Sequence, residues 1–120
     1  MPDDNEKRRT PRIQPYVAPC RVLDRTRRVA GYVMDLSPRG ARVSVESDPP
    51  TAGTTVIVEV RFARTSPHSL LPGQVRWIRG PEGPKSVYTF GMTFEGLTAE
   101  QHQVLNAVVE EFRRRAEELS

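Results

Sequence analysis

The spacing between apolar residues changes once along this chain, at residue 98, and this change limits the possible folds more than any other feature. Before residue 98, short runs alternate apolar and polar residues, which is the pattern of strands with one buried face. In the clearest run, residues 54–63, Val56, Val58 and Val60 share a face with Phe62. Six strands are predicted in all, at residues 16–23, 28–35, 40–46, 54–63, 70–78 and 86–95.

The residues after this point repeat at the spacing of an amphipathic helix. Thr98 and Gln101 form a capping-box pattern, in which each side chain can bond to the backbone N–H of the other residue. The apolar residues that follow are three or four positions apart: Val104, Leu105, Val108, Phe112, Ala116 and Leu119. We predict a helix that begins at Thr98 and runs to the last few residues.

Together these patterns predict one all-β domain with a C-terminal helix. We expect a six-stranded antiparallel β-barrel over residues 16–97, followed by an amphipathic helix over residues 98–120. The 11 prolines and 8 glycines suit the many turns of such a barrel. Residues 1–15 carry Pro2, Pro11 and Pro15 and lack a strand or helix pattern, so we expect a flexible, basic N-terminal segment.

Four strand residues carry specific expectations. Cys20 lies in an alternating apolar run and is expected to be a small apolar filler. Pro19 has no backbone N–H, which predicts a strand edge or a bulge at that point. Val75 and Trp77 are two positions apart, so they are expected to share a face, with Trp77 in the core or at the barrel edge.

The residue inventory gives little support to catalysis. The two histidines, His68 and His102, have no metal-ligating partner at helical spacing, and the single cysteine allows neither a zinc site with further cysteines nor an intrachain disulfide. Phosphate-binding glycine loops of the Walker and GxGxxG types are missing from the sequence. We therefore predict a protein that is not an enzyme and that needs no metal or cofactor.

The sequence also favours a location inside the cytoplasm. Its apolar runs all fall well short of the roughly 20 residues that a membrane-spanning helix needs. The first residues are charged rather than apolar, so they do not form a signal peptide.

Two motifs stand out from this background. The first is a basic stretch, residues 7–12, in which Arg8 and Arg12 are four positions apart. The second is the turn Asp35-Leu36-Ser37-Pro38-Arg39-Gly40 between two predicted strands. Asp, Ser, Pro and Gly are all favoured in turns for backbone reasons, and a short basic tail is often only solvated. The same residues can also offer a ligand a carboxylate, a hydroxyl and two guanidinium groups.

Taken together, the two motifs resemble the PilZ domain, a family of bacterial receptors for cyclic di-GMP. Arg8 and Arg12 match the RxxxR element of that family, and Asp35, Ser37 and Gly40 match its D/N-x-S-x-x-G element. The resemblance covers about residues 6–112, including the strands around Trp77 and Met92. It implies a six-stranded barrel followed by a helix, the fold that the apolar spacing also predicts.

The resemblance implies a role for each motif residue. Arg8 and Arg12 would bind phosphate oxygens or guanine edges, Asp35 would accept hydrogen bonds from a guanine, Ser37 would bind phosphate or guanine, and Gly40 would allow close approach. Three further residues are weaker candidates for the same site: Lys7, Arg9 and Arg39.

We therefore predict a cytoplasmic cyclic di-GMP receptor in which the ligand orders the N-terminal segment and so signals to a protein partner. The alternative is a PilZ-like structural or partner-binding domain that acts through its C-terminal helix without binding a nucleotide. A homodimer is one partner arrangement that this helix could form. A third class, single-stranded nucleic-acid binding, is suggested by the basic pI of about 9.5 but disfavoured by the small number of aromatic residues on predicted outer faces. Motility and exopolysaccharide secretion are among the processes such a receptor could regulate.

Overall fold

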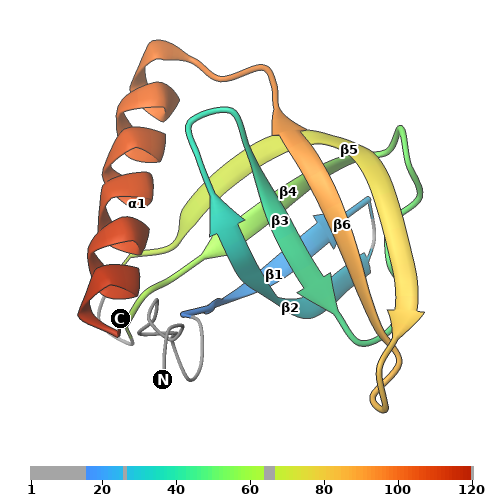
Figure 1. The fold of residues 1–120 in the computed structure, drawn as a ribbon. Helices are drawn as coiled ribbons and strands as arrows, with labels where there is room; N and C mark the ends of the chain where they lie inside the picture. The colour runs from blue at the N-terminus through green and yellow to red at the C-terminus, as the bar shows by residue number, and fades with distance from the viewer. Residues whose placement is uncertain (1–15, 26, 64–66, 120) are drawn as a thin grey trace, which may run out of the picture.

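The computed structural model of the chain describes residues 16–25, 27–63 and 67–119. Six strands are followed by one helix (Figure 1): β1 (Ala18–Asp24), β2 (Arg27–Leu36), β3 (Gly40–Val45), β4 (Thr55–Val60), β5 (Ser69–Glu82), β6 (Val87–Phe94) and α1 (Ala99–Glu118). The strands close into a barrel in the order β1-β2-β3-β6-β5-β4, and all neighbours are antiparallel. The predicted fold class is therefore confirmed.

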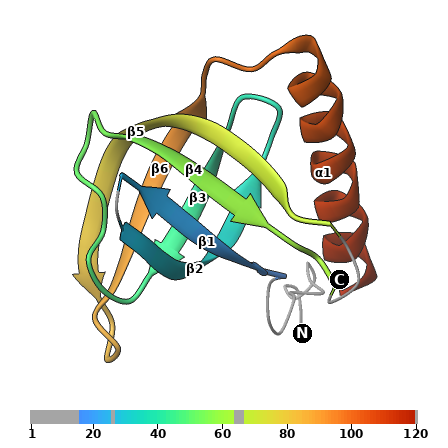
Figure 2. The ribbon, with the colours of Figure 1, turned by 180° about the vertical axis from the view of Figure 1, so that it is seen from behind.

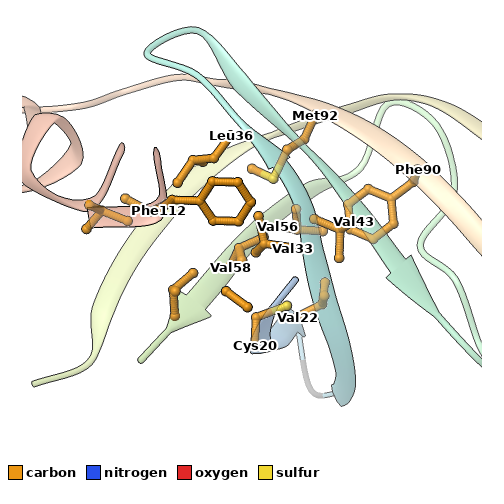
Figure 3. Close-up of a cluster of buried hydrophobic side chains, with 14 of the residues drawn as sticks. Cys20, Val22, Val33, Leu36, Val43, Val56, Val58, Phe90, Met92 and Phe112 are labelled. Atoms are coloured by element: carbon orange, nitrogen blue, oxygen red, sulfur yellow. The ribbon is translucent and has the colours of Figure 1, made fainter. Parts of the chain in front are cut away.

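The barrel interior is filled mainly by valines from alternate positions of the strands. Val56, Val58 and Val60 of β4 are all at most 1% exposed, as their alternation with polar residues predicts. Phe90 is the largest fully buried side chain, and Figure 3 shows it among the aliphatic residues of the cluster. Because β-branched residues pack well on a pleated surface, this composition suits a small closed barrel.

Two predictions about β1 are confirmed. Cys20 is a buried free cysteine, and burial raises the pKa of its thiol to about 12, so it acts as an apolar filler rather than as a nucleophile. Pro19 pairs with Tyr32 of β2, while the pairing of β1 with β4 begins only at Cys20. Pro19 thus lies beyond the end of the β1–β4 ladder, where its missing N–H costs no hydrogen bond.

The helix α1 lies beside the barrel, next to the loop between β2 and β3 (Figures 1 and 2). The predicted capping box is present: Thr98 accepts a hydrogen bond from the backbone of Gln101, and Gln101 accepts one from the backbone of Thr98. Four residues are buried against the barrel: Leu105, Val108, Val109 and Phe112.

The predicted apolar stripe of the helix needs a correction at both ends. Val104 and Leu119 are 40% and 55% exposed, and Val109, absent from the predicted stripe, is buried. The residues that do contact the barrel follow the period of 3.6 more closely, because adjacent positions 108 and 109 both fall within a stripe about 100° wide.

Two strands contain a β-bulge, and each bulge turns a side chain to the outer face of the barrel. In β2 the register shifts between Val33 and Asp35, and in β5 it shifts between Val75 and Trp77. The prediction that Trp77 shares the face of Val75 is therefore wrong. Val75 is 1% exposed, whereas Trp77 is 40% exposed, because the extra residue in β5 shifts the alternation by one position.

The hairpin between β5 and β6 also differs from the prediction. The predicted strands end at residue 78 and begin again at residue 86, but pairing continues, with a further register shift between Arg79 and Glu82, as far as Glu82 and Val87. The turn itself contains Gly83 at φ +79°, a conformation that favours glycine.

Candidate ligand-binding groove

The two bulges align four outward positions across four neighbouring strands. Asp35 of β2 pairs with Arg42 of β3, Arg42 pairs with Gly91 of β6, and Gly91 pairs with Trp77 of β5. A bulge that redirects one side chain is typical of strands beside a binding site. Here two bulges converge on the same row of the barrel surface.

This row is the floor of a shallow groove of about 270 Å³ on the outside of the barrel. Asp35 and the turn after β2 form one end, and Trp77 forms the other. The groove is lined by Asp35, Ser37, Gly40, Ala41, Arg42, Arg76, Trp77, Gly91, Met92 and Thr93.

The turn between β2 and β3 is held by Ser37. Its Oγ accepts hydrogen bonds from the backbone N–H of Arg39 (3.2 Å) and Gly40 (3.3 Å) and donates to the carbonyl of Gly40 (3.4 Å). The backbone N–H of Ser37 also donates to the carbonyl of Gly40 at 3.0 Å. Ser37 therefore fixes the shape of the turn whatever else it binds.

Gly40 is required by close approach of two strands rather than by a positive φ. It is not among the glycines with positive φ, but a Cβ placed on it would lie 2.1 Å from the carbonyl oxygen of Met92. Since the obstacle is backbone, no side-chain rotation would relieve the clash. The glycine of the motif thus has a structural role in joining β3 to β6.

Gly91 has a different role, which is to make room for the indole of Trp77. A Cβ on Gly91 would lie 2.3 Å from the indole ring, so the absence of a side chain lets the ring lie against β6. The guanidinium of Arg79 lies 5.4 Å from the centroid of the same ring, within the range of a cation–π contact. An aromatic surface with a cation beside it is thereby placed at the end of the groove.

Arg76, the extra residue of the β5 bulge, is held at the rim by two partners. Its Nε donates to Thr93 Oγ1 at 3.2 Å and its Nη2 to Glu95 Oε2 at 3.0 Å. Both charged side chains are about half exposed, so the pair contributes little to stability but fixes the direction of the guanidinium.

The structure brings together three of the predicted site residues and leaves the others apart or outside the description. Asp35, Ser37 and Gly40 line one groove. Arg39 is exposed and does not line it, and its carbonyl accepts a hydrogen bond from Phe94 at 2.9 Å. The remaining four lie outside the described residues: Lys7, Arg8, Arg9 and Arg12.

The sequence reasoning missed the three groove residues that have a cationic or aromatic side chain: Arg42, Arg76 and Trp77. The sequence does contain a signal for two of them. Within β5, the inward residues Val75 and Ile78 are three positions apart instead of two, which is the mark of an inserted residue in a strand.

A larger hollow of about 680 Å³ lies elsewhere on the barrel and contains none of the motif residues. Its lining includes Tyr32 and His68, a residue just before β5 that pairs with Glu59 of β4. Volume alone does not identify a site, and convergent polar groups are the better indicator. In the described part of the chain, no group of three or more histidines, cysteines and acidic residues is placed to hold a metal ion.

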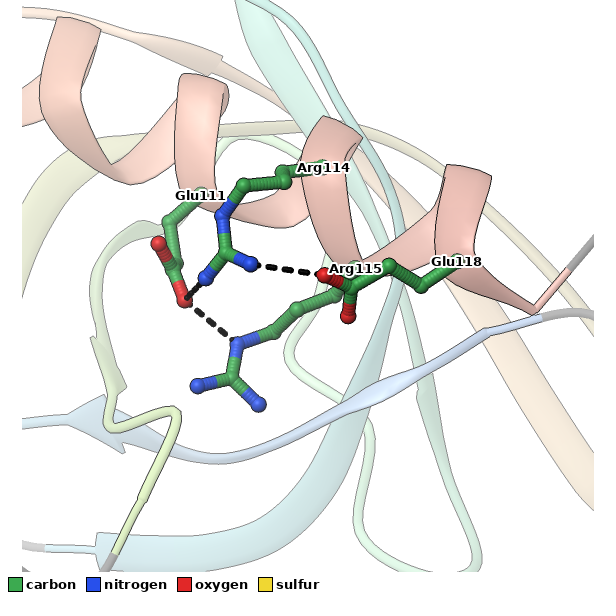
Figure 4. Close-up of polar contacts among 4 residues, drawn as sticks. All are labelled: Glu111, Arg114, Arg115 and Glu118. Atoms are coloured by element: carbon green, nitrogen blue, oxygen red, sulfur yellow. Dashed lines mark hydrogen bonds and ion pairs between the residues drawn. The ribbon is translucent and has the colours of Figure 1, made fainter.

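Glu110, Glu111 and Glu118 form ion pairs with arginines of the same helix. Figure 4 shows Glu111 accepting from Arg114 and Arg115, both at 2.6 Å, and Glu118 accepting from Arg114 at 2.8 Å. Hydrogen bonds from Arg114 and then from Arg115 lower the pKa of the Glu111 carboxyl. Glu111 and Glu118 are therefore surface groups paired with arginines of the same helix rather than candidates for acid–base catalysis.

Comparison with known proteins finds matches to one family and to its fold. The family model described as PilZ domain matches residues 6–111. The PilZ domain of YcgR from Escherichia coli, solved with c-di-GMP, superposes with a TM-score of 0.68 at 16% identity, over 85% of this chain and 86% of that one. The PilZ domain of CeSA from a cellulose-synthesizing bacterium gives 0.59 at 20% identity, over 83% and 96%.

Longer proteins share the fold as well. MrkH of K. pneumonia in its apo state superposes with a TM-score of 0.69 at 12% identity, and the aligned region covers 95% of this chain but 55% of that one. No curated protein matches the chain at the level of sequence similarity that we required. Within the described residues, no helix combines the length and the apolar character that a membrane crossing requires.

Proposed function

This chain belongs to the PilZ domain family, a family that binds cyclic di-GMP, and from that premise we propose that it is a receptor for this nucleotide. The observation that carries the proposal is the groove, in which the carboxylate of Asp35 and the turn of Ser37 and Gly40 meet on the outer face of the barrel. The receptor would act without catalysis and without a cofactor, and as a reader of a second messenger it would work in the cytoplasm.

The groove residues suit the chemistry of a dinucleotide. Cyclic di-GMP presents two guanines and two phosphates. Asp35 can accept hydrogen bonds from N1–H and the N2 amino group of a guanine, and the exposed face of Trp77 can stack on a purine. Arg79, whose guanidinium lies 5.4 Å from the centroid of the Trp77 ring, adds a cation beside the aromatic ring.

The second half of the proposed site is the pair Arg8 and Arg12, which lies within the part of the chain that matches the family model. Guanidinium groups bind phosphate oxygens and the O6 and N7 atoms of guanine in a forked arrangement. We propose that these two arginines bind the ligand over the groove, so that residues 1–15 become ordered when the nucleotide binds. The ordered segment would then be the surface that a protein partner recognises.

Isothermal titration calorimetry with cyclic di-GMP tests the proposal directly. We expect binding at micromolar concentrations and a loss of affinity of about tenfold to a hundredfold in Arg12→Ala and in Asp35→Ala, because each removes a contact worth about 1–3 kcal/mol. Arg28→Ala and Glu46→Ala remove the same charges from exposed positions outside the groove and should bind as the wild type does. Absence of heat for the wild type, or unchanged affinity in both motif variants, would refute the proposal.

Limited proteolysis with trypsin tests the ordering of the N-terminal segment. Trypsin cleaves after Lys and Arg, and residues 7–12 contain four such sites: Lys7, Arg8, Arg9 and Arg12. We expect saturating cyclic di-GMP to slow cleavage at these sites by about tenfold, because an ordered segment must open locally before it is cut. Mass spectrometry of the products would identify each cleaved bond. Equal cleavage rates with and without nucleotide, at a concentration where calorimetry shows saturation, would rule out the switch while leaving binding intact.

The alternative function, partner binding through α1 without a nucleotide, has one supporting observation, the exposure of Val104 and Leu119 on the helix. Light scattering distinguishes the two functions. A dimer that forms equally well with and without cyclic di-GMP, in a protein that gives no heat on titration, would favour the alternative.

A further inference from the structure

We propose that Arg42 determines the specificity of this site, by reading a guanine jointly with Asp35. The proposal rests on the function proposed above, since it assigns a role within the same groove. Arg42 is outside both sequence motifs and was not among the residues that sequence reasoning selected. Its position at the centre of the groove floor is what points to it.

The β2 bulge is what brings Asp35 and Arg42 together. Val33 pairs with Val43, and with regular alternation the next pair would place Met34 opposite Arg42. The bulge inserts one residue, so that Asp35 pairs with Arg42 instead, and both Met34 and Asp35 face outward. Residues directly opposite each other in an antiparallel pair have Cβ atoms roughly 4.5–5.5 Å apart. A carboxylate and a guanidinium are thus placed side by side on the outer face.

The Asp35 carboxylate and the Arg42 guanidinium do not bond to each other. Among the residues that the structure describes, neither an ion pair nor a hydrogen bond joins Asp35 to Arg42, and both are exposed. Their neighbours in the groove are already engaged: Arg76 is bound to Glu95 and Thr93, and Ser37 is bound within its own turn. The adjacent acceptor and donor of positions 35 and 42 therefore remain available to a ligand.

A guanine edge complements this pair of side chains. N1–H and the N2 amino group are donors, which suit the Asp35 carboxylate, while O6 and N7 are acceptors, which suit the fork of Arg42. Adenine presents an amino group where guanine has O6, so the Arg42 fork would face a donor there and keep only N7 as an acceptor. The space above Gly91, the next position in the row, is filled by the indole of Trp77, so an aromatic ring lies next to the pair that would bind the base.

The experiment measures the affinity of four proteins for two nucleotides by calorimetry and by competition up to millimolar concentration. The proteins are the wild type, Arg42→Ala, Arg42→Lys and the control Arg28→Ala, and the nucleotides are cyclic di-GMP and cyclic di-AMP. We expect Arg42→Ala to bind cyclic di-GMP about tenfold more weakly or worse, with affinity for cyclic di-AMP unchanged within about threefold. Arg42→Lys, which keeps the charge but loses the fork, should recover less than half of the lost binding free energy. Thermal melting checks that each variant is folded.

The failure of this inference can be told apart from the failure of the proposed function. If the wild type binds cyclic di-GMP and Arg42→Ala binds it within about twofold, the role of Arg42 is refuted and the receptor function stands. Full recovery by Arg42→Lys, or equal losses for both nucleotides, would show a simple charge contact and also refute guanine reading. If the wild type binds neither nucleotide, the proposed function itself fails.

Discussion

Replacement of Gly40 by alanine is expected to lower the free energy of unfolding by about 3 kcal/mol, near the upper end of the range for overpacked sites. The added Cβ would lie 2.1 Å from the Met92 carbonyl oxygen, so β3 and β6 would have to separate where they pair most closely. Urea denaturation followed by circular dichroism measures the change. Because the neighbouring strands also carry the groove, we expect nucleotide affinity to fall together with stability.

The matched control is Gly83→Ala in the β5–β6 turn. A Cβ there meets nothing within 4 Å, and only its positive φ of +79° opposes the substitution, at a cost of about 1 kcal/mol. If Gly40→Ala keeps the stability of the wild type and loses only nucleotide binding, then the glycine of the motif serves the ligand and not the barrel. That result would contradict the steric role inferred from the structure.

Replacement of Phe112 by alanine is expected to destabilise the protein by about 3–5 kcal/mol, the usual cost of removing a buried aromatic ring. Phe112 is 7% exposed, and its ring lies 5.1 Å from that of Tyr16 in an edge-on contact. It belongs to the same buried cluster as Leu36, the residue between Asp35 and Ser37 of the motif, and Figure 3 labels both. The substitution should therefore loosen the helix from the barrel close to the groove.

Two measurements define this effect. Thermal and urea unfolding give the stability, and hydrogen exchange of the α1 backbone shows whether the helix opens separately from the barrel. Val104→Ala, an exposed position on the same helix, should change stability by less than about 0.5 kcal/mol. If Phe112→Ala lowers the free energy of unfolding no more than Val104→Ala does, then α1 contributes little to the stability of the folded domain.

The fold could be predicted from the sequence because its signals are local and repeated. Alternation in β4 and the capping box at Thr98 both describe interactions between residues close in the chain, and the structure confirms them. The bulges were harder to anticipate. Each depends on a single extra residue whose effect is decided by pairing with another strand, and Trp77 was assigned to the wrong face for that reason.

The candidate site was predictable in part for a similar reason. Asp35, Ser37 and Gly40 lie within six residues of one turn, so their proximity follows from the sequence alone. Arg42 reaches the groove through the β2 bulge, whereas Trp77 reaches it only through the strand order β2-β3-β6-β5, which brings together positions more than thirty residues apart. Strand order is a property of the whole barrel, and no short pattern in this sequence specifies it.

The packing of Trp77 against Gly91 has a practical consequence. The chain contains one tryptophan, so all of its indole fluorescence originates at the end of the groove. The indole lies against Gly91 of β6, and the guanidinium of Arg79 is close to the ring. The emission of an indole depends on the polarity and the charges around it. The protein therefore carries an intrinsic optical probe in its candidate binding site, and the surroundings of that site can be followed in the unlabelled molecule.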